Sequence, residues 1–186
     1  MPPKVKVTRE DIVGAAVEIV RGKGAQAVNA RAVAAQLGCS TQPVFSNFEN
    51  MDALRLAVVE KADRLYNGYI QRELERGEFP GYKASGMAYI RFAREEKELF
   101  KLLYMRDRTG EQGPAYMVVS DQIQSLIQGQ TGLTGDRMQM FHLEMWAYVH
   151  GIATMFATGF LDLDWDLVSQ MLTDAYQGLK KQYEVE

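Results

Sequence analysis

Residues 30–54, ARAVAAQLGCSTQPVFSNFENMDAL, decide the fold of this chain. They predict a short helix, a turn at Gly38, a second short helix and the start of a third. Gly38 can adopt the left-handed backbone conformation that ends a helix, and Ser40 or Thr41 can cap the next one. Two short helices joined by a glycine-containing turn form a helix-turn-helix, which places its second helix in the DNA major groove.

The second helix of this motif is the predicted recognition helix. Its apolar residues are expected to face the core of the head: Val44, Phe45 and Phe48. Its outward residues are polar and uncharged: Thr41, Gln42, Ser46 and Asn47. Gln42 is the best candidate for a base contact, because its amide can form two hydrogen bonds with adenine. Pro43 and Val44 are candidates for contact with a thymine methyl group.

Apolar residues recur with the helical period along nearly the whole chain, and no segment alternates as a strand would. The fold class is therefore predicted to be all-α, with about nine helices. Thr8 and Asp11 resemble a capping box, Gly22 and Gly24 are expected to end the first helix, and residues 129–135 are expected to form a loop. The expected helices cover residues 10–20, 30–37, 41–47, 50–76, 82–95, 97–105, 114–128, 136–158 and 164–183.

Charge is distributed unevenly over the 186 residues. Residues 1–48 carry six lysines and arginines against three acidic residues, whereas the whole chain has a net charge of −3. A basic head on an acidic body is typical of a DNA-binding domain joined to a second function. We expect domains at 1–49 and 50–186. The start of the chain lacks the apolar core of a signal peptide and no membrane span is evident, which predicts a cytoplasmic protein.

Enzyme, metal and cofactor functions are not predicted. The single cysteine, Cys39, excludes an internal disulfide and a multi-cysteine zinc site, and a packing role for it is preferred over a redox switch. The two histidines, His142 and His150, are eight residues apart on one predicted helix, beyond the spacing of a helical metal pair. His150 is expected to be a hydrogen-bonded core residue. No glycine-rich phosphate loop or Gly-x-Ser-x-Gly turn is present.

The second half of the chain predicts a dimer and a ligand pocket. The last two predicted helices carry apolar surfaces that favour a four-helix dimer interface, although both helices can instead pack within one subunit. The expected interface residues are Met145, Ile152, Phe156, Val168, Met171, Leu172, Ala175, Tyr176 and Leu179. Methionine and aromatic side chains line adaptable apolar pockets as well as ordinary cores. The expected pocket residues, for an apolar or aromatic ligand, are Tyr66, Tyr69, Met87, Phe92, Tyr104, Met105, Tyr116, Trp146 and His150.

Residues 8–54 resemble the DNA-binding domain of the tetracycline-repressor (TetR) family of bacterial transcriptional regulators. The sequence Leu-Gly-Cys-Ser at 37–40 matches the turn, Val-Phe-Ser-Asn-Phe at 44–48 stands where the family has Leu-Tyr-x-His-Phe, and Asn50 opens the connecting helix. Trp146, His150 and Gly151 resemble the Trp-x-x-x-His-Gly motif of one group of its C-terminal domains. The resemblance implies a three-helix head, a connecting helix, a ligand-binding body and dimerisation through the last two helices.

Two departures concern phosphate contacts. Phe45 lacks the hydroxyl of the family's tyrosine, and Met51 replaces a lysine, while Lys4, Lys6, Arg9 and Arg31 offer substitute cations. The predicted DNA-binding residues are Thr8, Asn29, Arg31, Ser40, Thr41, Gln42, Pro43, Val44, Phe45 and Asn47. The resemblance implies a homodimeric repressor that a small-molecule effector releases from a palindromic operator. The alternative is a helical binding module with weakened DNA affinity that acts through protein partners.

Overall fold

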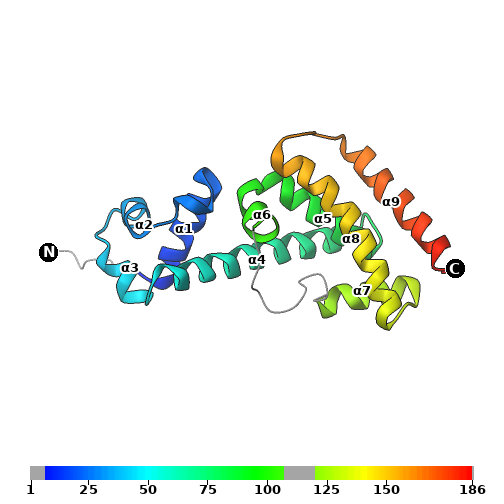
Figure 1. Ribbon diagram of the computed structural model, residues 1–186, viewed down its shortest axis with the longest axis horizontal. Coiled ribbons are helices and arrows are strands. Elements are labelled where there is room, and N and C mark those ends of the chain that lie inside the picture. Colours follow the sequence, from blue (N-terminus) through cyan, green and yellow to red (C-terminus); the bar gives the residue numbers. More distant parts are fainter. Residues whose placement is uncertain (1–6, 107–119, 186) are drawn as a thin grey trace. The chain divides into compact units, whose positions relative to one another are not determined.

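The computed structural model describes residues 7–106 and 120–185, and this part of the chain contains nine α-helices, one short 3-10 helix and no strand (Figure 1). The all-α prediction is therefore confirmed. In chain order the elements are α1 (Arg9–Lys23), η1 (Ala25–Ala27), α2 (Ala30–Gln36), α3 (Gln42–Asn47), α4 (Met51–Arg76), α5 (Gly81–Glu95), α6 (Lys97–Tyr104), α7 (Asp121–Thr131), α8 (Gly135–Thr158) and α9 (Trp165–Gln182).

Contacts between helices divide the chain into two compact units. Unit 1 contains the described residues up to Leu65 together with Glu96–Arg106, and unit 2 contains Tyr66–Glu95 and the described residues from Ser120 onward. Helix α4 is thus shared between the units, and α6 belongs with the N-terminal head although it follows α5 in sequence. The predicted domains at 1–49 and 50–186 differ from these contact-based units and remain a prediction.

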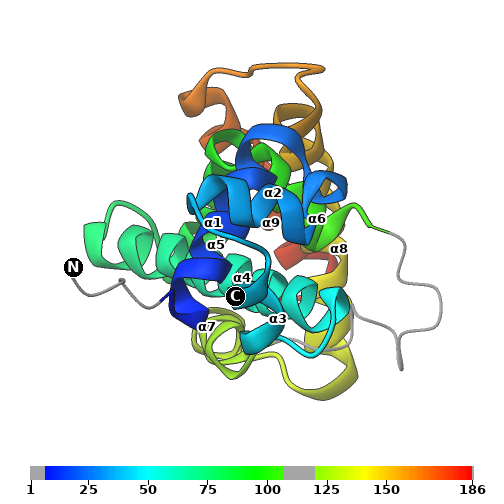
Figure 2. The same cartoon turned by 90° about the vertical axis from the view of Figure 1, so that its left-hand side faces the viewer.

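Helices α1, α2 and α3 form the head of unit 1 (Figures 1 and 2). Thr8 and Asp11 form the predicted capping box at the start of α1. That helix continues through Gly22, which does not end it, and terminates at Gly24, whose φ is 80°. Gly38 has a φ of 65° in the turn between α2 and α3, the left-handed conformation that glycine adopts without strain.

One face of α3 and its C-terminal cap residue, Phe48, pack inward. Val44 and Phe48, four residues apart, are 1% and 3% exposed and therefore fix which face of α3 packs inward. Phe45 is 57% exposed. The expectation that Phe45 faces the core is therefore wrong, because one residue after Val44 lies about 100° around the helix.

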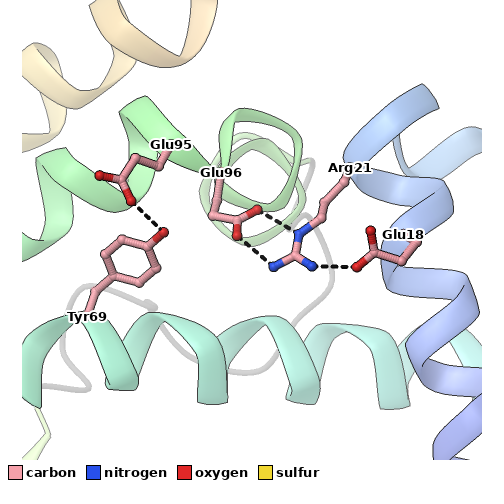
Figure 3. A network of polar contacts seen from close by, with 5 residues as sticks. All are labelled: Glu18, Arg21, Tyr69, Glu95 and Glu96. Carbon is pink, nitrogen blue, oxygen red and sulfur yellow. Dashed lines mark hydrogen bonds and ion pairs between the residues drawn. The ribbon is translucent and has the colours of Figure 1, made fainter. Parts of the chain in front are cut away.

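Helix α6 is fastened to α1 by a charged contact within unit 1. The Arg21 guanidinium donates two hydrogen bonds to the Glu96 carboxylate, at 2.8 and 2.6 Å, and a third to Glu18 (Figure 3). The hydrogen bonds that Arg21 donates to Glu96 raise the pKa of Arg21 further above its usual range. Arg21 therefore links α1 to the start of α6.

Helix α5 is the centre of unit 2, where α7, α8 and α9 all contact it. Nine of its residues are buried, from Tyr82 to Ala93. Small residues let the neighbouring helices approach: a Cβ atom at Gly86 would lie 3.1 Å from Leu172 Cδ2 and 3.6 Å from Val149 Cγ2. A side chain at this position would therefore require Leu172 of α9 to shift by a few tenths of an ångström, whereas its contact with Val149 of α8 would be ordinary van der Waals packing.

Helix α7 and the loop after it differ from the sequence prediction. The helix continues past Gly129 and ends at Thr131, so the expected loop over residues 129–135 shrinks to Gly132–Thr134. Gly132, with a φ of 67°, forms the actual C-terminal cap. The expected beginning of this helix, at residues 114–119, lies outside the described residues.

Candidate functional site

The outward surface of α3 and the turn before it presents hydrogen-bonding groups with no internal partner. Within the described residues, the side chains of Ser40, Thr41 and Gln42 make no hydrogen bond, and Ser40 and Gln42 are exposed. Thr41 occupies the N-cap position of α3, but its hydroxyl does not cap the helix. These three side chains can therefore use all their donors and acceptors on a molecule that approaches α3.

Two further polar side chains of α3 are partly occupied. The Ser46 hydroxyl donates to the Gln42 carbonyl at 2.9 Å, and the Asn47 amide donates to the Pro43 carbonyl at 2.8 Å. Val44, a predicted DNA contact, is buried, whereas Pro43 is half-buried. The exposed residues of α3 are Gln42, Phe45 and Ser46, and all three are neutral.

The residues predicted to contact phosphate at the helix starts are used as caps. Thr8 donates both its backbone N–H and its hydroxyl to the Asp11 carboxylate, at 2.9 and 2.8 Å. Asn29 Oδ1 accepts the Ala32 N–H at 3.0 Å, and the Asn29 amide donates to the Ala27 carbonyl. Hydrogen bonds from Thr8 also lower the pKa of Asp11 below its usual value.

The cations of the head are unequally available. Arg21 is paired with Glu96, and Arg9 lies over the Phe48 ring at 4.2 Å and donates to the Asn47 carbonyl. In the described part of the head, Lys23 and Arg31 are exposed and have no ion-pair partner. Lys4 and Lys6 lie outside the described residues. Arg31, in the first turn of α2, is therefore an exposed cation without an ion-pair partner in the helix that precedes the recognition helix.

A cluster of aromatic rings occupies unit 2. Tyr66 meets Tyr89 edge-on with ring centroids 5.6 Å apart, and both Tyr66 and Tyr69 contact Phe92. The Tyr89 hydroxyl is hydrogen-bonded to His150 Nδ1 at 2.9 Å, and Trp146 stacks on His150 at 4.8 Å. The structure thus joins into one cluster five of the nine predicted pocket residues, those in α4, α5 and α8.

The polar groups of this cluster are neutral near pH 7. Burial lowers the pKa of His150 below its usual range and raises that of Tyr89. A second pair repeats the arrangement between the same two helices, because the Tyr82 hydroxyl is hydrogen-bonded to His142 Nδ1 at 2.9 Å. Burial lowers the pKa of His142 to about 4. The cluster thus combines aromatic rings with neutral hydrogen-bonding groups.

The remaining predicted pocket residues do not join the aromatic cluster. Met87 is fully buried on α5, Tyr104 and Met105 belong to unit 1, and Tyr116 lies outside the described residues. Tyr89 was not among the predicted pocket residues, although it links Tyr66 to His150. The sequence offered one indication of this bond. Tyr82 and Tyr89 are seven residues apart on α5, and the two histidines are eight apart on α8, so the two pairs can face each other when these helices pack together.

Unit 2 also contains a buried carboxylate that the sequence did not single out. Glu73 on α4 is 1% exposed, and its Oε1 accepts hydrogen bonds from Arg91 at 2.6 Å and from Arg76 at 2.7 Å. Arg91 also lies against the Trp165 ring, 4.4 Å from its centroid. Glu73 Oε2 is buried without a hydrogen-bond partner among the described residues. This network connects α4, α5 and α9.

The predicted dimer residues fall into two groups. Five of them are buried within the single chain: Met145, Ile152, Phe156, Val168 and Leu172. The other four are half-buried on α9: Met171, Ala175, Tyr176 and Leu179. Large apolar side chains that are exposed lie instead at other positions of α8, α9 and the loop between them: Met140, Tyr148, Phe160, Leu161 and Leu167.

Two further findings concern membrane spans and metal ions. Within the described residues, no helix combines the length and apolar character that a membrane span requires. The same part of the chain holds no cluster of three or more His, Cys, Asp or Glu side chains arranged to hold a metal ion.

A comparison with models of known protein families finds a match to the second half of this chain. The model of the Tetracyclin repressor-like, C-terminal domain family matches residues 82–176, which is just over half of the chain. The match begins in α5, ends in α9 and includes the Trp146–His150 pair. The chain belongs to the TetR family of transcriptional regulators. A comparison with curated protein sequences finds no significant match.

Solved structures share the TetR fold along nearly the whole chain. A protein of unknown function from Rhodococcus sp. RHA1 aligns with a TM-score of 0.72 at 22% identity, covering 96% of this chain and 98% of that one. A TetR-like transcriptional regulator from the same organism has a TM-score of 0.66 at 14% identity, with the same coverage. The multidrug-binding protein EbrR, complexed with imidazole, has a TM-score of 0.58 at 18% identity and covers 90% and 93%.

Proposed function

We propose that this TetR-family chain binds a specific DNA sequence through α3 and represses transcription until a small molecule binds its body. The unsatisfied side chains of Ser40, Thr41 and Gln42 on the outward surface of α3 carry this proposal. A recognition helix needs such groups to form hydrogen bonds with base edges. Arg31 supplies a phosphate contact beside it, because phosphate contacts position a protein on DNA while base contacts specify the sequence.

The proposed regulator acts as a homodimer. One helix-turn-helix covers a half-site, so recognition of a palindrome requires two heads. The exposed apolar side chains of α8, α9 and their connecting loop support an interface there, because burying such a surface favours association. Gly151 and Gly178 are exposed on these two helices, and nothing in the described chain would meet a Cβ atom at either position. Both allow a partner helix to approach closely.

The proposed effector is apolar or aromatic and binds beside the aromatic cluster of unit 2. Tyr89 and His150 supply neutral hydrogen-bonding groups, and Trp146 and Tyr66 supply ring surfaces. An effector releases DNA only if it binds the DNA-incompetent state more tightly than the competent one. Imidazole, found in a protein of the same fold, is a convenient first probe of this cluster.

Selection of random DNA duplexes by the full-length protein tests the function. We expect recovery of a palindrome whose affinity falls steeply with salt concentration, because a dimer releases counterions from several phosphates. The effector is then sought by screening small aromatic compounds for displacement from that site. Weak binding without sequence preference would contradict the proposal and favour a module that acts through protein partners. The phosphate contacts missing at Phe45 and Met51 would then explain the weak DNA binding.

A further inference from the structure

Phe45 stands apart from the rest of the recognition helix. Phe45 is 57% exposed, and no other large apolar residue in the described part of α1, α2 and α3 is exposed. A single exposed apolar residue needs no explanation by itself. The position of Phe45 does call for an explanation. The buried Val44 and Phe48 orient α3 so that Phe45 lies on the same surface as Gln42, whose side chain makes no hydrogen bond within the described chain.

The register of α3 sets the distance between Phe45 and Gln42. Residues three apart on a helix are neighbours on its surface, and Phe45 follows Gln42 by three positions. With a rise of about 1.5 Å per residue, the two side chains are separated by about 4.5 Å along the helix axis. Successive base pairs are about 3.4 Å apart. The two side chains therefore reach base pairs about one step apart when α3 lies along the major groove.

The chemistry of Phe45 restricts what it can contact on DNA. A phenyl ring has no donor for a phosphate oxygen, so it cannot replace the hydrogen bond of a tyrosine hydroxyl. The major-groove edge of a base pair offers one apolar group, the C5-methyl of thymine, and phenylalanine is among the side chains that pack against it. The other exposed or half-exposed residues of α3 are also neutral, so this helix has no charged side chain that would draw it toward the DNA phosphates.

We propose that Phe45 determines specificity by packing against a thymine methyl group, about one base-pair step from the base pair that Gln42 contacts. The proposal rests on the proposed DNA-binding function and adds a thymine requirement to it. At the position where the resemblance implies a tyrosine that contacts a DNA phosphate, this chain would thus have a residue that contacts a base.

Deoxyuridine substitution isolates the methyl group. In the operator recovered by selection, each thymine is replaced in turn by deoxyuridine, which pairs identically but lacks the methyl. We expect the full-length protein to lose affinity about fourfold per half-site at one thymine, the value of one buried methyl group. The variant Phe45→Ala should bind the thymine and deoxyuridine sites equally. Leu56→Ala, which removes a 61% exposed side chain of α4 in the same unit, should keep the thymine dependence.

The outcomes separate this proposal from the function on which it rests. If a specific operator is recovered but no thymine is sensitive to deoxyuridine, or if the sensitivity persists in Phe45→Ala, the methyl contact is overturned while DNA binding stands. If no operator is recovered, both proposals are overturned. Thermal unfolding of the two variants excludes misfolding as the cause, because both side chains are exposed and their removal should leave stability within about 0.5 kcal/mol.

Discussion

The recognition helix and the body of this regulator differ in where their polar side chains find hydrogen-bond partners. In α2, α3 and the cap of α1, side-chain hydrogen bonds join residues two to four positions apart, as in Thr8–Asp11 and Asn47–Pro43. Only Arg9 and Arg21 of α1 reach further among the described residues of these helices, to the Asn47 carbonyl and to Glu96. Unit 2 has local hydrogen bonds too, but it adds several between helices far apart in sequence: Tyr82 bonds His142, and Lys83 donates to both Ser169 and Thr173 at 2.8 Å. The side chains of Ser40, Thr41 and Gln42 are thus left available for binding, whereas the long-range hydrogen bonds of the body connect its own helices.

This difference predicts that changing a polar residue of the body mainly affects stability. The largest effect is expected at Glu73, where Glu73→Ala should lower the free energy of unfolding by about 3 to 4 kcal/mol, because it leaves Arg91 without its buried carboxylate. Urea denaturation followed by circular dichroism measures it. Glu75→Ala, an exposed residue two positions later, is the control and should change stability by less than about 0.5 kcal/mol. Equal effects of the two substitutions would show that the Glu73 network does not stabilise the body.

Acid should weaken the body through its histidines. The pKa of His142 is about 4 in the folded chain because of burial, against about 6.5 when unfolded, so only the unfolded chain takes up this proton between those values. Stability should therefore decline as pH falls from about 6.5 toward 4, by up to about 3 kcal/mol, and return as pH rises. The lowered pKa of His150 acts in the same direction.

Urea denaturation at several pH values in this window measures the effect. His142→Gln keeps a polar group opposite Tyr82 but cannot titrate, so its stability should depend less on pH. A pH dependence identical to that of the wild-type protein would show that His142 is equally protonated in the folded and unfolded chains.

In the head, the corresponding change should affect binding rather than stability. Gln42→Ala is expected to cost about 1 to 3 kcal/mol of discrimination at one base pair, because the exposed amide is free to bond adenine. Repeating the DNA selection with the variant measures it. Gln36→Ala, at the exposed end of α2, is the control and should keep the wild-type preference. An unchanged preference in Gln42→Ala would exclude Gln42 as a base reader.

The same contrast explains what the sequence could predict. The head follows from caps, glycines and spacing within a few residues, so the Thr8 and Asn29 caps and the turn at Gly38 were all predictable. Phe45 was misplaced because apolar character alone does not set the rotation of a six-residue helix. In the body, the Tyr89–His150 bond and the Glu73 network depend on residues from separate helices. No local pattern indicates which tyrosine a histidine will meet 61 positions away.

The smallest predicted effect tests whether the head depends on its local caps. Asn29 Oδ1 accepts the Ala32 N–H at the start of α2, so Asn29→Ala should lower the free energy of unfolding by about 1 kcal/mol. Asn29→Asp keeps the acceptor and adds a negative charge at the helix N-terminus, which should hold stability near the wild-type value. The same charge should repel DNA phosphates and weaken operator binding, because Asn29 lies two positions before Arg31. If Asn29→Asp instead lost stability as Asn29→Ala does, the cap would not be what fixes α2, and the separation of folding from binding in the head would fail.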